Sequence, residues 1–310
     1  MRRTRLFPLV LFLSLLVVGA SLAAPVDQFP LTLRDDLGRS VTLRQPPQRI
    51  VSLAPSNTEV LYALGLGDRV VGVDRFSDYP PEARGKPKVG GMVDPDYERI
   101  LSLRPDLVLA TGGVQRPVVE KLESLGVPVF ALHPQTVEGV LDSILTVARL
   151  GGVTRKGWEV VAKLRGRIRA VTLKTGKIPL SRRPTVFWII WPEPLMTAGP
   201  RTFIHSLITL AGGRNIAGDL AGPRDYPLYS MEELVARDPD VIIATTDAHG
   251  AVGKLSEKPG WRRLRAVRAG RVYFVDPDLV HRPGPRLVDG LEAIARLLHP
   301  PLFSEKAGGR

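Results

Sequence analysis

The stretch ERILSLRPDLVLAT, residues 98–111, decides the fold because it occurs a second time as EELVARDPDVIIAT, residues 232–245. The two copies match without a gap at a constant offset of 134 residues. Each reads as a helix, a Pro-Asp turn and a short apolar run typical of a buried parallel strand. A match that keeps its register over a helix, a turn and a strand predicts a duplicated lobe.

Short apolar runs alternate with helix-like stretches on both sides of each copy. They lie at residues 50–54, 70–73, 107–110 and 127–132, and again at 185–190, 241–244 and 272–275. This alternation predicts α/β lobes with mainly parallel, Rossmann-like sheets. Trp188 falls within one of the runs, so we expect it in the core.

Local signals place the helices between these runs. The Ser-x-x-Glu patterns at Ser56 and Ser230 predict capping boxes, and Asp94 before a proline predicts another helix start. Residues 154–174 carry apolar side chains at spacings of three and four, which predicts one long helix of about 31 Å, at roughly 1.5 Å per residue. Such a helix could join the two lobes as a stiff connection.

These patterns predict six segments along the chain. They are a signal peptide at 1–23, a β-hairpin at 24–48, lobe one at 49–135, a helical connection at 136–183, lobe two at 184–299 and a tail at 300–310.

The N-terminus predicts export. A basic start, MRRTR, precedes an apolar run at residues 6–18, and small residues support cleavage after Ala23 or nearby. An uncleaved membrane anchor is the alternative, although the run is short for a membrane span. The chain has no cysteine, so we expect no disulfides and no lipoprotein, which favours a periplasmic location.

Composition narrows the classes of partner. The 310 residues carry a formal net charge of +12, which could favour nucleic acid, anionic lipid or an anionic ligand. The basic residues are scattered, however, and the densest group, at 262–271, has no interleaved aromatic residues. We interpret them as solvated surface, with no nucleic-acid partner.

Motifs of enzymes are missing from the sequence. There is no phosphate-binding glycine loop, no G-x-S-x-G elbow and no cysteine nucleophile, and the five histidines lack metal-ligand spacing. We therefore expect no enzyme, no catalytic residues, no metal site and no resident cofactor. An exported metal-dependent enzyme and a structural or adhesive protein remain less favoured alternatives.

Aromatic residues gather in loops after the predicted strands. Phe76 and Tyr79 follow one strand, Trp191 follows another, and Tyr226 precedes the second capping box. Aromatic loops beside prolines suit a large flat ligand, whereas ordinary loop packing is the alternative. In the last loop, Asp278 and Arg282 could address polar ligand groups or could form only a local surface pair.

Four motifs together resemble one known family. They are IVSLAPSNTE at 50–59, SDYPP at 77–81, LRPDLV at 103–108 and RPGPR at 282–286. With the long helix, they resemble the helical-backbone (class III) periplasmic substrate-binding proteins of ABC importers, over residues 49–299. That family serves importers of vitamin B12, ferric siderophores and haem, and this order of motifs most resembles its cobalamin-binding members.

The resemblance implies roles for particular residues. Phe76, Tyr226, Asp278 and Arg282 match ligand-contact positions of the cobalamin-binding members, with Tyr226 where a tryptophan is usual. Glu98 and Glu232 match two glutamates that dock on a membrane permease dimer. A tryptophan expected near Gly90-Gly91-Met92 is missing.

The resemblance therefore predicts a monomeric periplasmic binder that delivers cobalamin or another corrinoid to a permease. A ferric siderophore or haem is the alternative ligand.

Overall fold

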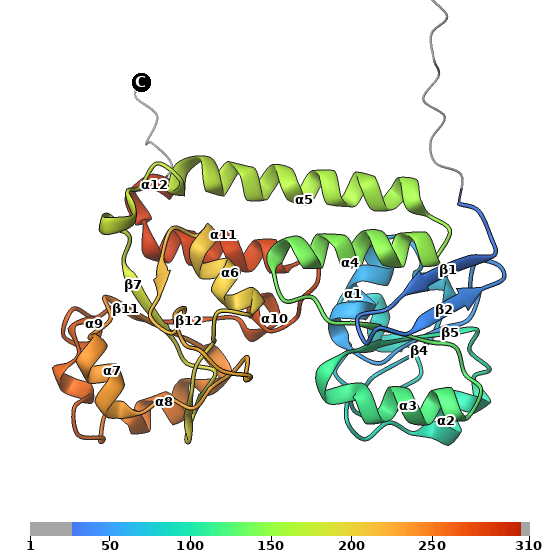
Figure 1. Cartoon of the computed structure of the whole chain (residues 1–310), viewed down its shortest axis with the longest axis horizontal. Coiled ribbons are helices and arrows are strands. Elements are labelled where there is room, and N and C mark those ends of the chain that lie inside the picture. The colour runs from blue at the N-terminus through green and yellow to red at the C-terminus, as the bar shows by residue number, and fades with distance from the viewer. Residues whose placement is uncertain (1–26, 305–310) are drawn as a thin grey trace, which may run out of the picture.

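The structure is a computed structural model that describes residues 27–304. The predicted signal peptide, residues 1–23, and the last six residues of the predicted tail lie outside the described residues. Two lobes stand side by side beneath a long helix, α5, which runs across both of them (Figure 1). The predicted fold, two α/β lobes with parallel sheets bridged by one long helix, is confirmed.

Lobe one is built on a four-stranded parallel sheet in the order β4-β3-β5-β6. Its strands are β3 (Ile50–Ser52), β4 (Val70–Val73), β5 (Leu107–Thr111) and β6 (Val129–Leu132). Its helices are α1 (Pro55–Ala63), α2 (Tyr97–Ser102) and α3 (Arg116–Ser124). An antiparallel hairpin, β1 (Leu31–Arg34) and β2 (Ser40–Leu43), precedes the sheet.

Lobe two repeats this plan with a parallel sheet in the order β10-β7-β11-β12. Its strands are β7 (Thr185–Trp188), β10 (Arg214–Asn215), β11 (Val241–Thr245) and β12 (Val272–Val275), with a small hairpin of β8 (Trp191–Pro192) and β9 (Leu195–Met196). Its helices are α6 (Phe203–Leu210), α7 (Met231–Arg237), α8 (His249–Leu255), α9 (Arg265–Arg268), α10 (Pro277–Val280), α11 (Leu287–Leu298) and α12 (Pro300–Phe303).

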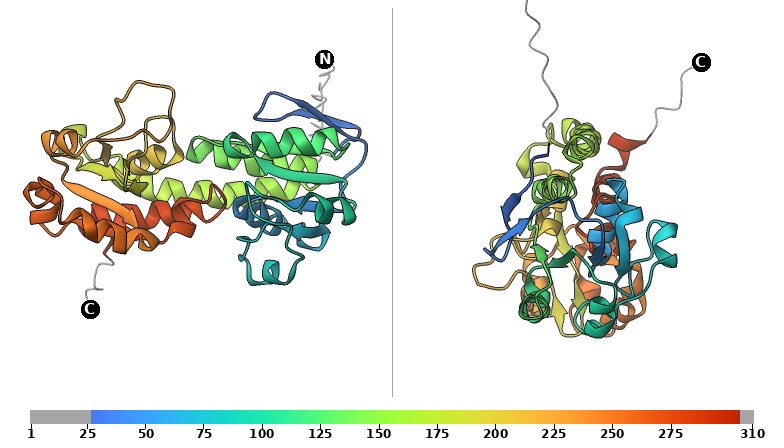
Figure 2. Two further views of the ribbon diagram at one scale, coloured as in Figure 1. Left: turned by 90° about the horizontal axis from the view of Figure 1, so that it is seen from below. Right: turned by 90° about the vertical axis from the view of Figure 1, so that its right-hand side faces the viewer.

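The connection between the lobes consists of α4 (Val137–Leu150) and α5 (Thr154–Thr175). α5 packs along α4 on the side of lobe one and along α11 on the side of lobe two (Figures 1 and 2). Gly157 allows the close approach to α4, because a Cβ there would lie 2.5 Å from the Cβ of Ala148. One apolar core cluster contains residues of both lobes and of α5, so the lobes share a packed spine.

The two copies of the repeat fold alike down to single residues. The side chains of Asp96 and Ser230 cap α2 and α7, and each accepts a hydrogen bond from the backbone N–H three residues later. Arg104 and Asp238, at the same repeat position, both have positive φ, 46° and 37°. These equivalences explain why the sequence match has no gap.

Two predicted helix starts are wrong. α1 begins at Pro55 after Ala54, whose side chain makes no capping hydrogen bond, so Ser56 lies inside the first turn. Proline at the first helical position sets the start, since it needs no N–H partner there. α2 is capped by Asp96 and not by Asp94. The capping residue predicted at Ser230 is confirmed.

Candidate ligand-binding site between the lobes

A buried ion pair joins the two lobes. Glu59, on α1 of lobe one, is only 3% exposed. Its carboxylate accepts two hydrogen bonds from Arg286, just before α11 of lobe two, at 2.7 Å from Nη2 and 3.0 Å from Nε. This two-point geometry orients both side chains, which are 227 residues apart in the chain.

Arg282 extends this ion pair toward the surface. Its Nη1 lies 2.7 Å from Asp78 Oδ1 of lobe one, and its Nη2 lies 2.7 Å from Asp278 Oδ1. The same guanidinium is 3.7 Å from Glu59. Glu59, Asp78, Asp278, Arg282 and Arg286 thus form one charged group, here called the interlobe clamp.

Burial and charge act in opposite directions on the acids of the clamp. Burial raises the pKa of Glu59, and the neighbouring Arg286 and Arg282 offset part of that rise. Burial also favours the neutral form of Asp78, but the hydrogen bond and charge of Arg282 outweigh it and lower the pKa of Asp78. The clamp therefore contains two kinds of carboxylate. Ionised Glu59 costs free energy because it is buried, whereas ionised Asp78 is stabilised by Arg282.

A chain of buried hydrogen bonds fixes the loop after β4. Asp74 Oδ2 accepts from the N–H of Phe76 at 2.9 Å, and Asp74 also accepts from Ser77 Oγ. Ser77 Oγ lies 2.7 Å from Thr58 Oγ1, so the loop is tied to α1. Burial raises the pKa of Asp74, with its hydrogen-bond donors opposing the rise. These bonds hold the backbone from which the exposed Phe76 side chain projects.

The predicted aromatic contacts occupy different surroundings. Phe76, in the loop after β4, is 54% exposed, and Trp191, in the hairpin strand β8 that follows β7, is 58% exposed. Both follow the carboxyl ends of parallel strands, where such sheets present ligand contacts. The ring of Tyr79 packs under the Arg286 guanidinium, 4.0 Å away, so its position is tied to the clamp. Tyr226 is half-buried, and burial together with Asp225 raises its pKa to about 12. Trp188 is fully buried in the core.

A small cavity lies where the two lobes meet. Its volume is about 80 Å³. It is lined by Thr111, Leu132, His133, Pro134 and Gln135 of lobe one, and by Arg201, Thr202, Phe203, Asp225, Tyr226 and Pro283 of lobe two. This space is too small to enclose a macrocycle. Of the six predicted ligand contacts, only Tyr226 lines it.

Comparison with known proteins identifies the family. Residues 50–279 match the model of the periplasmic binding protein family. The chain belongs to that family. This periplasmic binding protein is 36% identical to an ABC transporter substrate-binding lipoprotein, YvrC, of Bacillus subtilis, over 90% of this chain and 88% of the relative. It is 34% identical to a cobalamin-binding protein of Halobacterium salinarum, over 87% of this chain and 74% of the relative.

Solved structures share the two-lobed, class III architecture. The vitamin B12 binding protein BtuF of Vibrio cholerae superposes with a TM-score of 0.72 at 28% identity, over 84% of this chain and 99% of that one. The haem-binding protein BhuT, in complex with two haems, superposes with a TM-score of 0.72 at 29% identity, over 83% of this chain and all of that one. The family consists of substrate-binding proteins and not of enzymes, and it implies a membrane permease and a small-molecule ligand.

One prediction is corrected by these relatives. The lack of cysteine led to the expectation that the protein is not a lipoprotein, but the Bacillus subtilis relative is a substrate-binding lipoprotein. Because the similarity to this lipoprotein covers 90% of the chain, the exclusion of a lipoprotein was wrong. A role outside the cytoplasmic membrane agrees with the relatives.

Sequence reasoning missed several residues of the periplasmic binding protein's site. Glu59 was interpreted as a capping glutamate, although it anchors the clamp. His133 and Arg201 line the small cavity, and the only signal for them is their place near the end of β6 and before α6. Asp278 and Arg282 do form the local pair considered from sequence, but the pair also reaches lobe one through Asp78.

Three further findings concern metal binding, membrane spanning and the protonation of His281. Among residues 27–304, no group of three or more histidine, cysteine or acidic side chains could hold a metal ion. Within the same range, every helix is too short or too polar to cross a membrane. Burial lowers the pKa of His281, which favours its neutral form.

Proposed function

We propose that this periplasmic binding protein captures cobalamin or another corrinoid between its lobes and delivers it to the permease of an ABC importer. The proposal depends on the two exposed aromatic side chains, Phe76 and Trp191, which follow sheet strands of opposite lobes. Flat apolar faces of this kind suit a macrocycle. The cobalamin-binding protein of Halobacterium salinarum and the vitamin B12 binding protein of Vibrio cholerae support this choice of ligand.

The proposed contacts divide by chemistry. Phe76, Trp191 and Tyr226 pack on the faces of the macrocycle, and Tyr79 borders it beside the clamp. Asp278 and Arg282 bind polar groups at its edge. To do so, they give up part of the ion pairing that they make in the clamp. The basic side chain of Arg201 and the imidazole of His133 lie at the small cavity, where a polar side group of the ligand could enter.

Haem or a ferric siderophore is the second candidate. The similarity to BhuT in complex with two haems favours haem, and exposed basic side chains such as Arg201 suit anionic groups. Calorimetric titration of the purified protein with cyanocobalamin, haemin and ferric siderophores separates the candidates. Tight one-to-one binding of cobalamin alone supports the corrinoid, whereas tight binding of only haemin or a siderophore keeps the family and replaces the ligand.

A matched pair of variants tests the aromatic contacts. Phe76→Ala should weaken cobalamin binding by more than about 1 kcal/mol, roughly fivefold or more, because a packed aromatic contact is lost. Leu180→Ala removes a side chain of similar exposure from a turn beyond the end of α5 and should leave binding unchanged. Equal affinities for Phe76→Ala and the parent protein would remove Phe76 from the proposed site.

Glu98 and Glu232 are proposed to dock the loaded protein on the permease. Both are exposed in the first turns of α2 and α7, which lie on the side of the lobes away from α5 (Figure 1). The double substitution to Ala should spare ligand binding and abolish transport in vesicles that contain the permease. Glu120→Ala with Glu257→Ala, exposed acids from the same two lobes, is the control. Lost ligand binding in the docking variant would contradict the assignment.

A further inference from the structure

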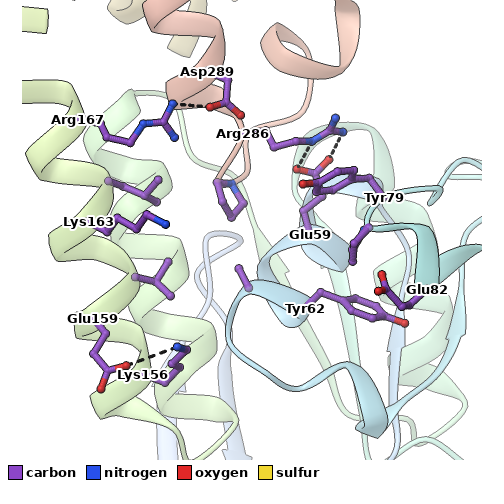
Figure 3. Close-up of a pocket in the computed structure, with 15 residues that line it drawn as sticks. Glu59, Tyr62, Tyr79, Glu82, Lys156, Glu159, Lys163, Arg167, Arg286 and Asp289 are labelled. Atoms are coloured by element: carbon purple, nitrogen blue, oxygen red, sulfur yellow. Dashed lines mark hydrogen bonds and ion pairs between the residues drawn. The ribbon is translucent and has the colours of Figure 1, made fainter.

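A second cavity, of about 720 Å³, lies beneath the linking helix (Figure 3). One wall is α5, the opposite wall is α1 and the loop after β4, and the start of α11 completes it. Its lining residues are Glu59, Tyr62, Ala63, Tyr79, Pro80, Glu82, Lys156, Glu159, Val160, Lys163, Leu164, Arg167, Pro285, Arg286 and Asp289. It borders the clamp through Glu59 and Arg286 and includes Tyr79 of the predicted ligand contacts, but no residue lines both this cavity and the small one between the lobes, so the two spaces are separate.

The charges around the cavity are balanced in number. Four acidic and four basic side chains line it, so neither a polyanion nor a polycation is favoured. Three basic residues already have partners. Arg286 pairs with Glu59, Arg167 lies 2.5 Å from Asp289, and Lys156 lies 3.5 Å from Glu159.

Two opposite charges remain, one on each wall. Lys163 projects from α5 into the space, and Glu82 stands across from it beside Tyr62 (Figure 3). Neither forms an ion pair or a side-chain hydrogen bond with another residue in the range 27–304. The gap between an unpaired ammonium and an unpaired carboxylate is complementary to a molecule that carries one charge of each sign.

We propose that this cavity is a second binding site, and that it takes a small zwitterion with an acidic group at one end and an ammonium group at the other. The acidic group lies against Lys163, and the ammonium group lies against Glu82 and the ring of Tyr62. Val160, Leu164 and the tyrosine rings cover the hydrocarbon between the two charges. The volume is within the range of about 300–1,000 Å³ that is usual for small-molecule sites.

The first test uses 6-aminohexanoate, with hexanoate and hexylamine as probes that keep only one charge each. The zwitterion should bind the purified protein with a dissociation constant of about 1 mM or tighter, measured by calorimetry at low salt. Each singly charged probe should bind at least about tenfold more weakly, since it leaves one wall unpaired. Phosphoethanolamine, which carries the charges of a lipid headgroup, distinguishes a headgroup source from a free amino acid by which probe binds more tightly.

Two variants assign the binding to the cavity. Lys163→Met and Glu82→Gln should each weaken 6-aminohexanoate binding about tenfold, because each removes one charge-assisted contact. Arg169→Met, an exposed basic residue of α5 that does not line the cavity, should have no effect. A thermal melt of each variant checks that the fold is intact.

Three results would overturn the proposal. They are no saturable binding of either zwitterion, equal weakening by Lys163→Met and Arg169→Met, and displacement of the zwitterion by the ligand that occupies the interlobe site. Simultaneous binding of both ligands supports it. Because the titration with cobalamin, haemin and siderophores reports on the other site, a failure here leaves the proposed transport function untouched.

Discussion

The two lobes begin their first strands alike and end them differently. Asp106 accepts hydrogen bonds from the backbone of Gln48 and Arg49 before β3, and Asp240, at the same repeat position, accepts from the N–H and hydroxyl of Thr185 at the start of β7. At the opposite ends, β3 finishes at the buried Ser52, whose hydroxyl accepts a hydrogen bond from Thr58 and so joins the polar chain that leads to Asp74, whereas β7 finishes at the fully buried Trp188. The repeated sequence therefore fixes how the first strand of each lobe begins, and the lobes differ at the ends of these strands.

The lobes also differ in what they bring to their common boundary. Lobe one supplies the carboxylates Glu59 and Asp78, and lobe two supplies the arginines 282 and 286 together with Asp278. The two lobes thus share one fold but present side chains of complementary charge at their boundary. Because Glu59 is nearly inaccessible to water, the clamp fixes how the lobes are oriented, and desolvation of its charged groups costs free energy.

The largest effect is expected from breaking the clamp on the side of lobe one. Glu59→Ala leaves Arg286 without its main partner in a mostly buried place, and removing one member of a buried pair typically costs about 3–5 kcal/mol. Urea unfolding should show this loss of free energy of unfolding. Glu120→Ala, an exposed acid of the same lobe, is the control and should change stability by less than about 0.5 kcal/mol. A similar small change for Glu59→Ala would mean that the clamp acts as a surface pair.

Two aspartates, Asp74 of lobe one and Asp240 of lobe two, should make the stability depend on pH in opposite directions. The pKa of Asp74 is raised above its ordinary value of 3.8, so the folded state binds the proton more tightly and this group's contribution to stability is lost as pH rises through the raised value. The pKa of Asp240 is lowered because its hydrogen bonds to Thr185 and the charge of Arg265 outweigh burial, so its contribution is lost as pH falls below 3.8.

Paired substitutions separate these two contributions. Asp74→Asn should make the free energy of unfolding fall more steeply as the pH is lowered, because the contribution of Asp74, which favours the folded state at low pH, is gone. Asp240→Asn should make this fall less steep, because the contribution of Asp240, which is lost at low pH, is gone. Chemical denaturation between about pH 3 and pH 7 measures both slopes. Slopes that change in the same direction for both variants would contradict the comparison.

The sequence predicted the frame far better than the site, and particular residues show why. The repeat and the spacing in 154–174 are local patterns, and they were sufficient to predict two lobes and the bridging helix α5. Glu59 could not be interpreted in this way, because its partner Arg286 lies 227 residues away and no periodicity links them. Within the local pattern Glu59 resembles a capping residue, and only the packing of the lobes reveals it as buried.

The equivalent helix caps provide a test in which the two lobes should behave alike. Asp96→Ala and Ser230→Ala each remove the side chain that accepts a hydrogen bond at the start of α2 or α7, so each should cost about 1 kcal/mol of unfolding free energy. The caps are in separate lobes and share no partner, so the double variant should cost the sum. A marked departure from additivity in urea unfolding would indicate that the two repeats are coupled more tightly than their separation suggests.

The smallest effect is expected at the positive-φ residue that closes each repeated helix. Arg104 has φ 46° in lobe one, and a left-handed conformation costs a residue with a side chain roughly 1 kcal/mol relative to glycine. Arg104→Gly should therefore raise the free energy of unfolding by up to about 1 kcal/mol, reduced by the larger entropy of glycine in the unfolded chain.

Asp238→Gly relieves the same strain, but it also removes the carboxylate that accepts a hydrogen bond from Arg265 N–H at 2.6 Å. The two effects should nearly cancel, so stabilisation in lobe one with none in lobe two would show that Asp238 holds its strained position for that contact. Equal stabilisation by both glycines would instead mean that the hydrogen bond to Arg265 contributes nothing to lobe two.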